Sequence, residues 1–413
     1  MIIDSLKYNG LCTCGKTHKM ETVFSVVEGG CLKNLWTYLR QYGLTGCTAA
    51  IYDENTYKAT ADRHPQVDFE IILKPDNLHA NEHGVQLLSQ QLPEEAEVLL
   101  AIGSGTVHDI VRYCAYERKV DFVSCPTAAS VDGFCSSVAA MTWRGCKKTL
   151  TAVAPKIVVA DLDIIRKAPV RLARSGFGDM IGKYIALTDW KIANLLTGEF
   201  YCEKIANLTL KATEAVLLSA EGIARGDEAA YEKLMGGLLL SGLAMQMMGN
   251  SRPASGAEHH ISHLIEMEPE GLGVHSDALH GEKVGVGTLL AVREYHRLGS
   301  LENPKFTDYC LYTQEEIRAV FGKMADEILG ENAADAADGL SGMRLSECWQ
   351  AICEELGKLP TEQALEKIYC TMGIKASLPD IDVPAQAQPA LLRCAPMVRN
   401  RLTLMRLRKC IIA

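Results

Sequence analysis

The sequence has no excess of basic residues, no long uninterrupted apolar run and no recognisable secretion signal. Its 42 Lys and Arg against 51 Asp and Glu give a net charge of −9, which repels a phosphate backbone and argues against nucleic-acid binding. The N-terminal MIIDSLKYNG carries an acidic residue where a signal peptide has basic ones. The most apolar stretch, residues 236–249, is interrupted by Gly, Ser and Gln, and it is shorter than the roughly 20 residues that span a bilayer. We therefore expect a buried helix there and no membrane span.

The cysteines also lack the pattern of a disulfide framework. There are 15, an odd number, scattered from Cys12 to Cys410. Together with the missing secretion signal, this predicts reduced thiols and a cytoplasmic protein. The segment from Cys12 to His18 shows only three metal-ligand side chains at cramped spacing, so a hairpin turn is favoured over a zinc site. Six basic residues between Arg393 and Lys409 predict the exposed face of a terminal helix.

The apolar pattern predicts two kinds of structure along the chain. Short apolar runs that read as strands alternate with helical segments in the first part; they cover residues 47–52, 69–73, 97–102, 121–125 and 156–160. This alternation is typical of a parallel sheet covered on both faces. After Pro169 the spacing is helical, including continuous helices over residues 171–190 and 387–408. We predict an α/β domain over residues 1–165 and an all-α domain over residues 166–413.

Two loops follow predicted strands at the edge where α/β proteins bind ligands. The first is Gly103-Ser104-Gly105-Thr106, which precedes a helical stretch. It could cradle a pyrophosphate at a helix N-terminus, but His108 replaces the third glycine of the usual motif, so a simple tight turn is equally open. The second loop ends in Asp132-Gly133. Asp132 could bind substrate hydroxyls there, or form only a local turn.

Histidine is concentrated in one part of the chain. Five of the 11 histidines lie within 22 residues, at positions 259, 260, 263, 275 and 280. On a helix, His259 and His263 share one face, whereas His260 points about 100° away. Two imidazoles and a carboxylate form a three-ligand metal site with an open position for substrate. The carboxylate candidate is Asp179, flanked by Gly176 and Gly178.

Several ordered motifs carry a family resemblance. GSGTVHD, PTAASVDGF, SGFGDMIGKY, SRPASGAEHHISH and HGEKVG resemble the sn-glycerol-1-phosphate dehydrogenase family, in its bacterial form. That family belongs to the iron-type alcohol dehydrogenase and dehydroquinate synthase superfamily. The resemblance implies a dehydroquinate synthase-like architecture, in which a Rossmann-like NAD(P)-binding domain precedes a helical metal- and substrate-binding domain.

The resemblance also implies site residues. Asp179, His259 and His280 would hold one divalent metal ion, Asp132 would bind substrate, and His263 would sit at the substrate. For the proton we expect a neighbouring imidazole or an ordered water as the source, with His263 as the first choice. The residues that would contact NAD(H) or NADP(H) are Gly105, Thr106, Val107, His108, Asp109, Thr127, Ala128, Ala129, Ser130 and Ser136. Because such folds place an acid on the adenosine ribose at the end of an early strand, Asp53 predicts a preference for NAD over NADP.

One position departs from the iron-dependent branch, where a further metal-binding histidine often follows the aspartate by four residues. Here that residue is Lys183, and we expect its ammonium group to meet a substrate phosphate, with Arg252 as a second candidate. The expected reaction interconverts dihydroxyacetone phosphate and sn-glycerol 1-phosphate, with zinc, nickel or iron as the metal, in a homodimer. The alternatives are a glycerol or polyol dehydrogenase, a dehydroquinate synthase-like lyase, and a non-catalytic metal-binding protein.

Overall fold

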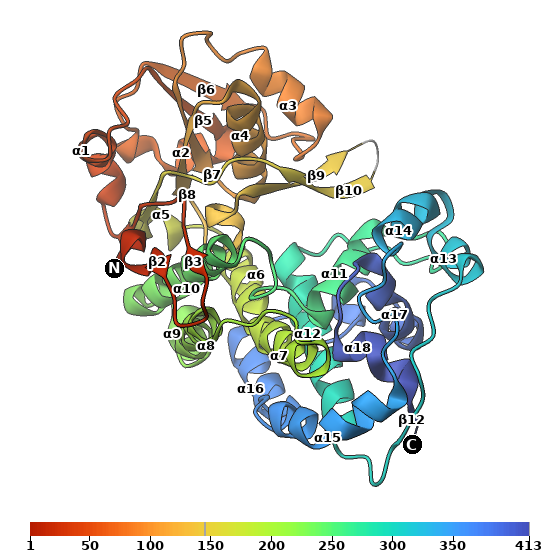
Figure 1. Cartoon of the computed structure of the whole chain (residues 1–413). Coiled ribbons are helices and arrows are strands. Elements are labelled where there is room, and N and C mark those ends of the chain that lie inside the picture. The colour runs from red at the N-terminus through yellow and green to blue at the C-terminus, as the bar shows by residue number, and fades with distance from the viewer. Residues whose placement is uncertain (144–145, 413) are drawn as a thin grey trace. The chain divides into compact units, whose positions relative to one another are not determined.

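The computed structural model describes residues 1–143 and 146–412, with two compact units in the chain (Figure 1). The first unit comprises Met1–Met180 and Glu214–Asn250, and the second comprises Ile181–Thr213 and Ser251–Ala413. The chain thus returns to the first unit after having entered the second. The assignment of NAD(P) binding to residues 1–165, and of metal and substrate binding to residues 166–413, remains a prediction.

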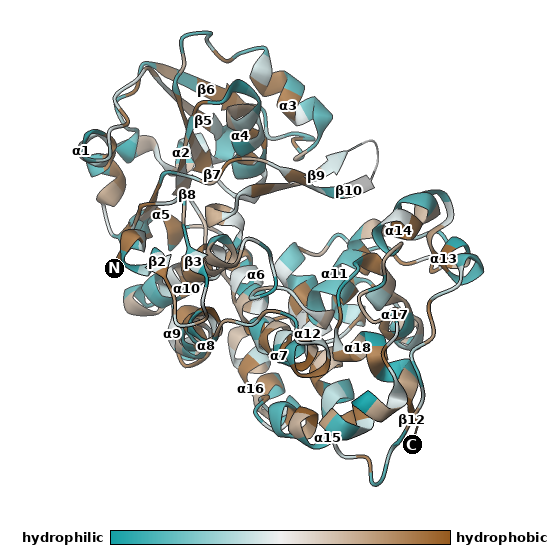
Figure 2. Cartoon of the chain, in the orientation of Figure 1, coloured by the Kyte–Doolittle hydropathy of each residue, from teal (hydrophilic) through white to brown (hydrophobic). Residues whose placement is uncertain are grey.

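The first unit is built on a seven-stranded sheet that is parallel except at one edge. The strand order is β1-β4-β11-β8-β7-β5-β6, and only the β1–β4 pair is antiparallel within this sheet. The strands are β1 Ile2–Asp4, β4 Phe24–Glu28, β5 Thr48–Asp53, β6 Phe69–Leu73, β7 Val98–Gly103, β8 Asp121–Pro126 and β11 Ile157–Asp161. Brown, the colour of hydrophobic residues, is prominent in β7 and β8 in Figure 2, and these central strands are buried, as parallel strands covered on both faces are.

Alternate residues of the central strands β5, β7 and β8 pack into two separate cores. Ala50 and Tyr52 of β5 pack into one hydrophobic cluster, and Ala49 and Ile51 into the other, as the two-residue period of a strand requires. Helices cover these faces because parallel strands need crossover connections. The helices assigned to this unit are α1 Leu35–Gln41, α2 Glu54–Ala59, α3 Glu82–Ser89, α4 Gly105–Arg118, α5 Leu162–Ile165, α6 Val170–Ile181, α9 Ala220–Arg225 and α10 Glu228–Met248.

Two antiparallel hairpins complete the first unit. Strands β2 Gly10–Leu11 and β3 Thr17–His18 form one, and β9 Val138–Trp143 and β10 Cys146–Thr151 form the other. The apolar stretch at residues 236–249 lies in α10, as expected, and the helix ends at Gly249, whose φ of +77° suits a left-handed C-cap.

Up to residue 412, the regular structure of the second unit is helical apart from one two-residue strand pair, β12 Lys305–Phe306 with β13 Ile411–Ile412. Helix α12 packs against α11, α15 and α16, and α15 also packs against α7. The helices are α7 Lys183–Thr197, α8 Glu203–Leu217 (which the division crosses), α11 Ala257–Met267, α12 His280–Gly299, α13 Gln314–Phe321, α14 Ala325–Glu331, α15 Gly342–Leu356, α16 Glu362–Met372, α17 Gln388–Cys394 and α18 Leu404–Leu407.

The overall architecture confirms the predicted α/β and helical parts, but the prediction of continuous long helices was wrong at two places. The helix expected over residues 171–190 is divided at Gly182 into α6 and α7. The helix expected over residues 387–408 is α17, a 3-10 turn at Ala395–Val398, an extended Arg399 and then α18. Pro396 lacks the N–H that a helix interior needs, which accounts for the break.

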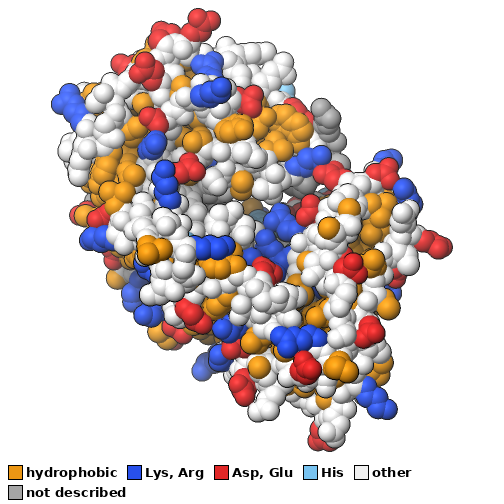
Figure 3. Space-filling view, viewed as in Figure 1, with side chains coloured by type: hydrophobic (Ala, Val, Ile, Leu, Met, Phe, Trp, Pro, Cys, Tyr) orange, Lys and Arg blue, Asp and Glu red, His pale blue; other side chains and the backbone are white. Residues whose placement is uncertain are grey.

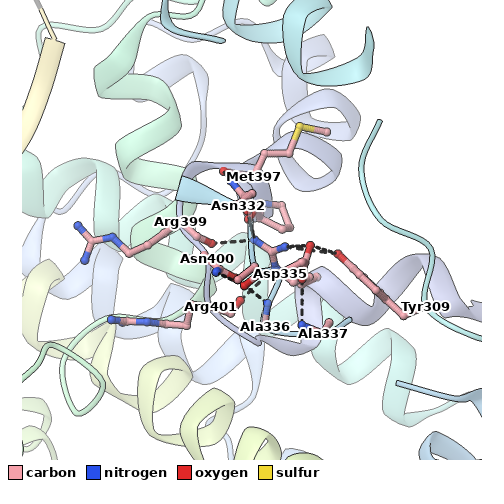
Figure 4. Close-up of polar contacts among 12 residues, drawn as sticks. Tyr309, Asn332, Asp335, Ala336, Ala337, Met397, Arg399, Asn400 and Arg401 are labelled. Carbon is pink, nitrogen blue, oxygen red and sulfur yellow. Dashed lines mark hydrogen bonds and ion pairs between the residues drawn. The ribbon is translucent and has the colours of Figure 1, made fainter. Parts of the chain in front are cut away.

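The exposed basic face expected for that segment was also wrong. The guanidinium of Arg406 is fully buried and forms an ion pair with Asp335 at 2.6 Å. It also donates to Asn332 and to the carbonyl of Arg399, in the network shown in Figure 4. These contacts fix the end of the chain onto α14 and the turn that follows it. Arg406 therefore has a structural role within the second unit.

The surface carries charges of both signs. On the face drawn in Figure 3, acidic and basic side chains lie interspersed. Over residues 1–143 and 146–412, the structure has no helix that combines the length and apolar character needed to cross a bilayer. None of the 14 cysteines whose side chains are described forms a disulfide, as predicted from their irregular spacing.

Candidate active site

A cavity of about 700 Å³ lies at the carboxyl ends of the central strands of the first unit. Its lining includes Asp53 at the end of β5, Ser104 after β7, and Thr127 and Ala128 after β8. These three strands are neighbours in the sheet, so loops from distant parts of the sequence meet here. Open parallel sheets bind ligands at this edge, and the cavity is large enough for a sizeable cofactor.

The glycine-containing loop turns the chain from β7 directly into α4. A Cβ atom on Gly103 would come within 2.7 Å of Val107, whose side chain is buried, so the close turn needs glycine. The first-turn N–H groups of α4 and the positive end of its dipole suit an anion. Of the residues predicted to contact a dinucleotide here, Gly105 and Thr106 begin this first turn.

The side chain of His108 has a structural partner at each ring nitrogen. Its Nδ1 donates to the Ser104 carbonyl at 2.9 Å, and its Nε2 lies 2.9 Å from the hydroxyl of Ser124 on β8. Burial lowers the pKa of this imidazole to about 3, so it is neutral at physiological pH. The neighbouring Asp109 pairs with the buried Arg112 at 3.2 Å. The side chains of His108 and Asp109 therefore stabilise the start of α4.

Helix α6 packs closely on the loop that follows β8. Ser175 donates to the carbonyl of Ser130 at 3.2 Å, and a Cβ on Gly176 would lie 2.2 Å from the carbonyl oxygen of Ala129. The backbone N–H of Asp132 donates to the Asp179 carboxylate at 3.0 Å. The structure thus brings two sequence-predicted residues together, Asp132 and the buried Asp179. The Asp132 carboxylate also accepts a hydrogen bond from Ser241 at 2.8 Å, while the predicted cofactor residue Ser136 bonds the Val138 carbonyl nearby.

Three imidazoles form a cluster in the second unit, and two of them, His259 and His263, are the pair that the helical spacing placed on one face. His259 and His263 lie one turn apart on α11, and His280 begins α12. The ring centroids are 5.9 Å apart for His259–His263, 5.4 Å for His259–His280 and 5.6 Å for His263–His280. Potential ligand nitrogens of His259 and His280 lie within 4.8 Å of each other. His275, by contrast, is exposed and pairs with Glu268.

Two carboxylates fix the protonation pattern of this cluster. Glu258 accepts from Nδ1 of His259 at 2.6 Å, and Glu266 accepts from Nδ1 of both His263 and His280, at 3.2 and 2.8 Å. Since a carboxylate is an acceptor, each Nδ1 carries the proton and each Nε2 carries a lone pair. Histidines that bind metals usually donate their other ring N–H to a carboxylate in this way. The donor set therefore fits a divalent metal ion.

The electrostatics of the cluster reinforce this pattern. Burial would raise the pKa of Glu266, but His280 and His263 together lower it well below its usual range, so the carboxylate stays ionised. Burial lowers the pKa of His263 to about 4, in spite of the opposing effect of Glu266. His263 is consequently neutral at physiological pH and can accept a proton at Nε2.

The two residues predicted to meet a substrate phosphate have structural partners. Lys183 is fully buried at the start of α7, and its ammonium donates to the carbonyl of Ala254 at 3.0 Å. The guanidinium of Arg252 pairs with Glu199 and donates to the carbonyl of Leu402 at 2.9 Å. These bonds position both side chains within the second unit.

Comparison with known proteins decides the family. The sequence model described as iron-containing alcohol dehydrogenase matches residues 26–169. The chain is 38% identical to glycerol-1-phosphate dehydrogenase [NAD(P)+] of Bacillus licheniformis over 77% of this chain and 80% of that protein. It is 32% identical to the protein of the same name from Geobacillus stearothermophilus, over 95% and 94% of the two chains. The chain belongs to the glycerol-1-phosphate dehydrogenase family. It is an oxidoreductase, as the sequence motifs predicted.

The solved structures agree on the fold of this family member. The sulfoacetaldehyde reductase of Bifidobacterium kashiwanohense, solved in complex with NAD+, aligns with a TM-score of 0.63 at 13% identity, over 95% of this chain and 96% of that one. At that identity the likeness establishes the fold, which is that of the iron-containing alcohol dehydrogenases. NAD(P) and a metal ion are expected for the family.

Two carboxylates of the cluster were missed from the sequence, although a signal for them was present. Glu258 directly precedes His259, and Glu266 lies three residues after His263 and seven after His259, which places it on the same helical face. Nothing in the local sequence, however, connects Glu266 with His280, because that contact depends on how α11 packs against α12.

Proposed function

We propose that this enzyme interconverts dihydroxyacetone phosphate and sn-glycerol 1-phosphate, with hydride transfer at C2 to or from NAD(P). The observation that carries the proposal is the cluster of three imidazoles whose Nδ1 protons are held by Glu258 and Glu266. This is a preorganised set of metal ligands and proton acceptors. The curated relatives whose names specify glycerol-1-phosphate supply the substrate class.

We propose Asp179, His259 and His280 as the ligands of one zinc, nickel or iron ion. Asp179 is buried in α6 one residue before the first unit ends at Met180, and the Asp132 N–H holds one of its oxygens. A divalent ion bound by these residues supplies Lewis-acid polarisation of the substrate carbonyl. Glu258 and Glu266 keep the imidazoles in the tautomer that ligation needs.

The cofactor is proposed to bind in the cavity of the first unit. The predicted contacts comprise Gly105 to Asp109, Thr127 to Ser130, and Ser136, with the α4 N-terminus facing the pyrophosphate. Asp53 lines the same cavity, and its Oδ1 accepts the N–H groups of Asn55 and Thr56 at 2.8 Å each. Its negative charge disfavours a 2′-phosphate, so NAD is the preferred cofactor.

We propose that Asp132 binds the hydroxyl end of the substrate and that His263 exchanges the proton of the reacting hydroxyl. Ser241 donates to one oxygen of Asp132, which orients this carboxylate to fix the hydroxyl end of the substrate. His263 is neutral, with Nδ1–H directed to Glu266. Its Nε2 therefore accepts the hydroxyl proton during oxidation and returns it during reduction.

A group of cations near α11 favours a phosphate-bearing substrate. Besides Lys183 and Arg252, the predicted candidates, we propose Arg399 and Arg401 as phosphate ligands. Their side chains extend to the same side in Figure 4, away from Asp335 and Tyr309. Burial, reinforced by the positive charges of Arg399 and Arg252, lowers the pKa of Arg401 to about 9. The negative charge of a bound phosphate would offset this repulsion and the cost of desolvation.

NADH oxidation with dihydroxyacetone phosphate tests the proposed reaction. We expect chelation to abolish turnover, a divalent ion to restore it, and chiral analysis to identify the sn-1 product.

Unphosphorylated dihydroxyacetone should be a far poorer substrate than the phosphate ester. Arg401→Gln should raise KM for the phosphate ester, whereas Arg393→Gln, at an exposed position of α17, should not. Full activity after exhaustive metal removal would refute the metal role. Equal efficiency with dihydroxyacetone would favour a polyol dehydrogenase, and turnover without stoichiometric NADH consumption would favour a lyase.

The cytoplasmic location and the homodimer remain predictions. Size-exclusion chromatography with light scattering measures the second directly.

A further inference from the structure

A second group of metal-ligand side chains lies in the β2–β3 hairpin of the first unit. The loop between the strands is tight: the N–H of Cys12 donates to the carbonyl of Lys16, and the N–H of Gly15 donates to the carbonyl of Cys12, both at 2.9 Å. Gly15 has a φ of +85°, a conformation that glycine adopts without strain. This turn brings the potential ligand atoms of Cys12, Cys14 and His18 within 4.8 Å of one another.

The orientation of His18 distinguishes this group from a chance meeting of polar side chains. Its Nδ1 lies 2.8 Å from the carbonyl oxygen of Met247 on α10. A carbonyl only accepts, so Nδ1 carries the proton and Nε2 presents a lone pair. That Nε2 lies 3.3 Å from the sulfur of Cys14. The carbonyl of α10 thus acts as the outer partner that metal-bound histidines usually have.

The distances suit a tetrahedral metal ion. Bonds of about 2.3 Å to sulfur and 2.0 Å to nitrogen at a tetrahedral angle separate the two ligand atoms by roughly 3.5 Å. The observed separation of 3.3 Å needs only a small adjustment. Cys12 and His18 are buried and Cys14 is half-buried, so the ligands are largely shielded from water.

We propose that Cys12, Cys14 and His18 bind a structural zinc ion, separate from the proposed catalytic metal. Two thiolates and an imidazole select zinc over magnesium or calcium. Binding releases the thiol protons to solvent and involves no change of oxidation state. The ion would fasten the hairpin to α10 through His18, and a fourth ligand would complete the tetrahedron. The ion would also stabilise this short hairpin, which has only two residues per strand.

Sulfur ligands give the test a readout that the catalytic site does not share. No sulfur is among the proposed catalytic ligands Asp179, His259 and His280. The full-length chain is prepared with cobalt in place of the native metal, and thiolate-to-cobalt charge-transfer absorption is recorded in the near ultraviolet. In the zinc-loaded chain, a mercurial reagent that blocks thiols should release one equivalent of zinc, detected with a chromogenic chelator.

Cys14→Ser and His18→Asn are the informative variants, with Cys310→Ser, which replaces an exposed cysteine of the second unit, as the matched control. We expect the charge-transfer band in the wild type and in C310S, with its intensity at least halved in C14S and its position shifted in H18N. His280→Ala should leave the band unchanged, which separates this site from the catalytic one. Absence of the band from the folded wild-type chain, or its persistence unchanged in C14S, would overturn the proposal. The wild-type measurement decides even if a variant fails to fold.

Discussion

Glu266 offers a direct test of how the histidine cluster is organised. A single carboxylate accepts Nδ1–H from both His263 and His280, at 3.2 and 2.8 Å. In Glu266→Gln the amide oxygen can serve only one of them, and the amide NH2 faces the other. If that other ring is His280, it must either lose its hydrogen bond or move its proton to Nε2, the nitrogen that should bind metal.

The expected size of the effect follows from the role of such outer partners. Replacing a hydrogen-bond partner of a metal-bound histidine typically costs 10- to 100-fold in metal affinity or activity, or about 1.4 to 2.8 kcal/mol. The substitution is nearly isosteric, so we expect the fold to persist. His263 and His280 lower the pKa of Glu266, so this residue is ionised in the wild type. The substitution therefore also removes a negative charge near the proposed metal site, which lowers the affinity for the metal further.

The assay combines metal competition against a chelator of known affinity with kcat/KM for dihydroxyacetone phosphate. Glu268→Gln is the matched control, because Glu268 makes the same kind of bond to His275 Nδ1, at 2.6 Å, on the exposed side. We expect the control to behave as the wild type. Metal affinity and kcat/KM within twofold of the wild type in Glu266→Gln would refute the inferred role of this carboxylate.

Two further substitutions test the first unit. Because burial lowers the folded-state pKa of His108 to about 3, its contribution to stability is present above pH 6.5 and is lost as the pH falls toward 3, by about 2 kcal/mol at pH 5. The free energy of unfolding, measured with urea, should therefore fall less between pH 7 and pH 5 in His108→Gln than in the wild type. His79→Gln, at an exposed position, is the control and should behave as the wild type. An equal fall in His108→Gln and the wild type would contradict this prediction. In Gly176→Ala the new Cβ would lie 2.2 Å from the carbonyl oxygen of Ala129, so we expect a lower Tm, by an amount equivalent to about 1–3 kcal/mol, and a higher KM for NADH. Gly330→Ala, with nothing within 4 Å of its Cβ, is the control, and indistinguishable behaviour of the two variants would show that the loop is not held as described.

The strands of the sheet that were predicted from the sequence are those with compact apolar runs. Phe69–Leu73 was predicted with the same bounds as β6, and β5, β7, β8 and β11 within a residue or so. The edge strand β1, which has only three residues, and its neighbour β4, Phe24–Glu28, were both missed. The long helices were predicted across Gly182 and Pro396 because periodicity alone does not detect a local break in a helix.

The sequence by itself determined the family, the alternation of strands and helices, and the residue types available for chemistry, because these depend on local order and on motifs. Tertiary structure decided which partners those residues have. Glu266 reaches His280 across the α11–α12 interface, and His18 reaches the α10 carbonyl 229 residues away along the chain. The basic segment was expected to face solvent, but in the structure Arg406 is buried and pairs with Asp335. A side chain's protonation state and hydrogen bonds depend on neighbours brought together by packing, and a linear pattern does not specify those neighbours.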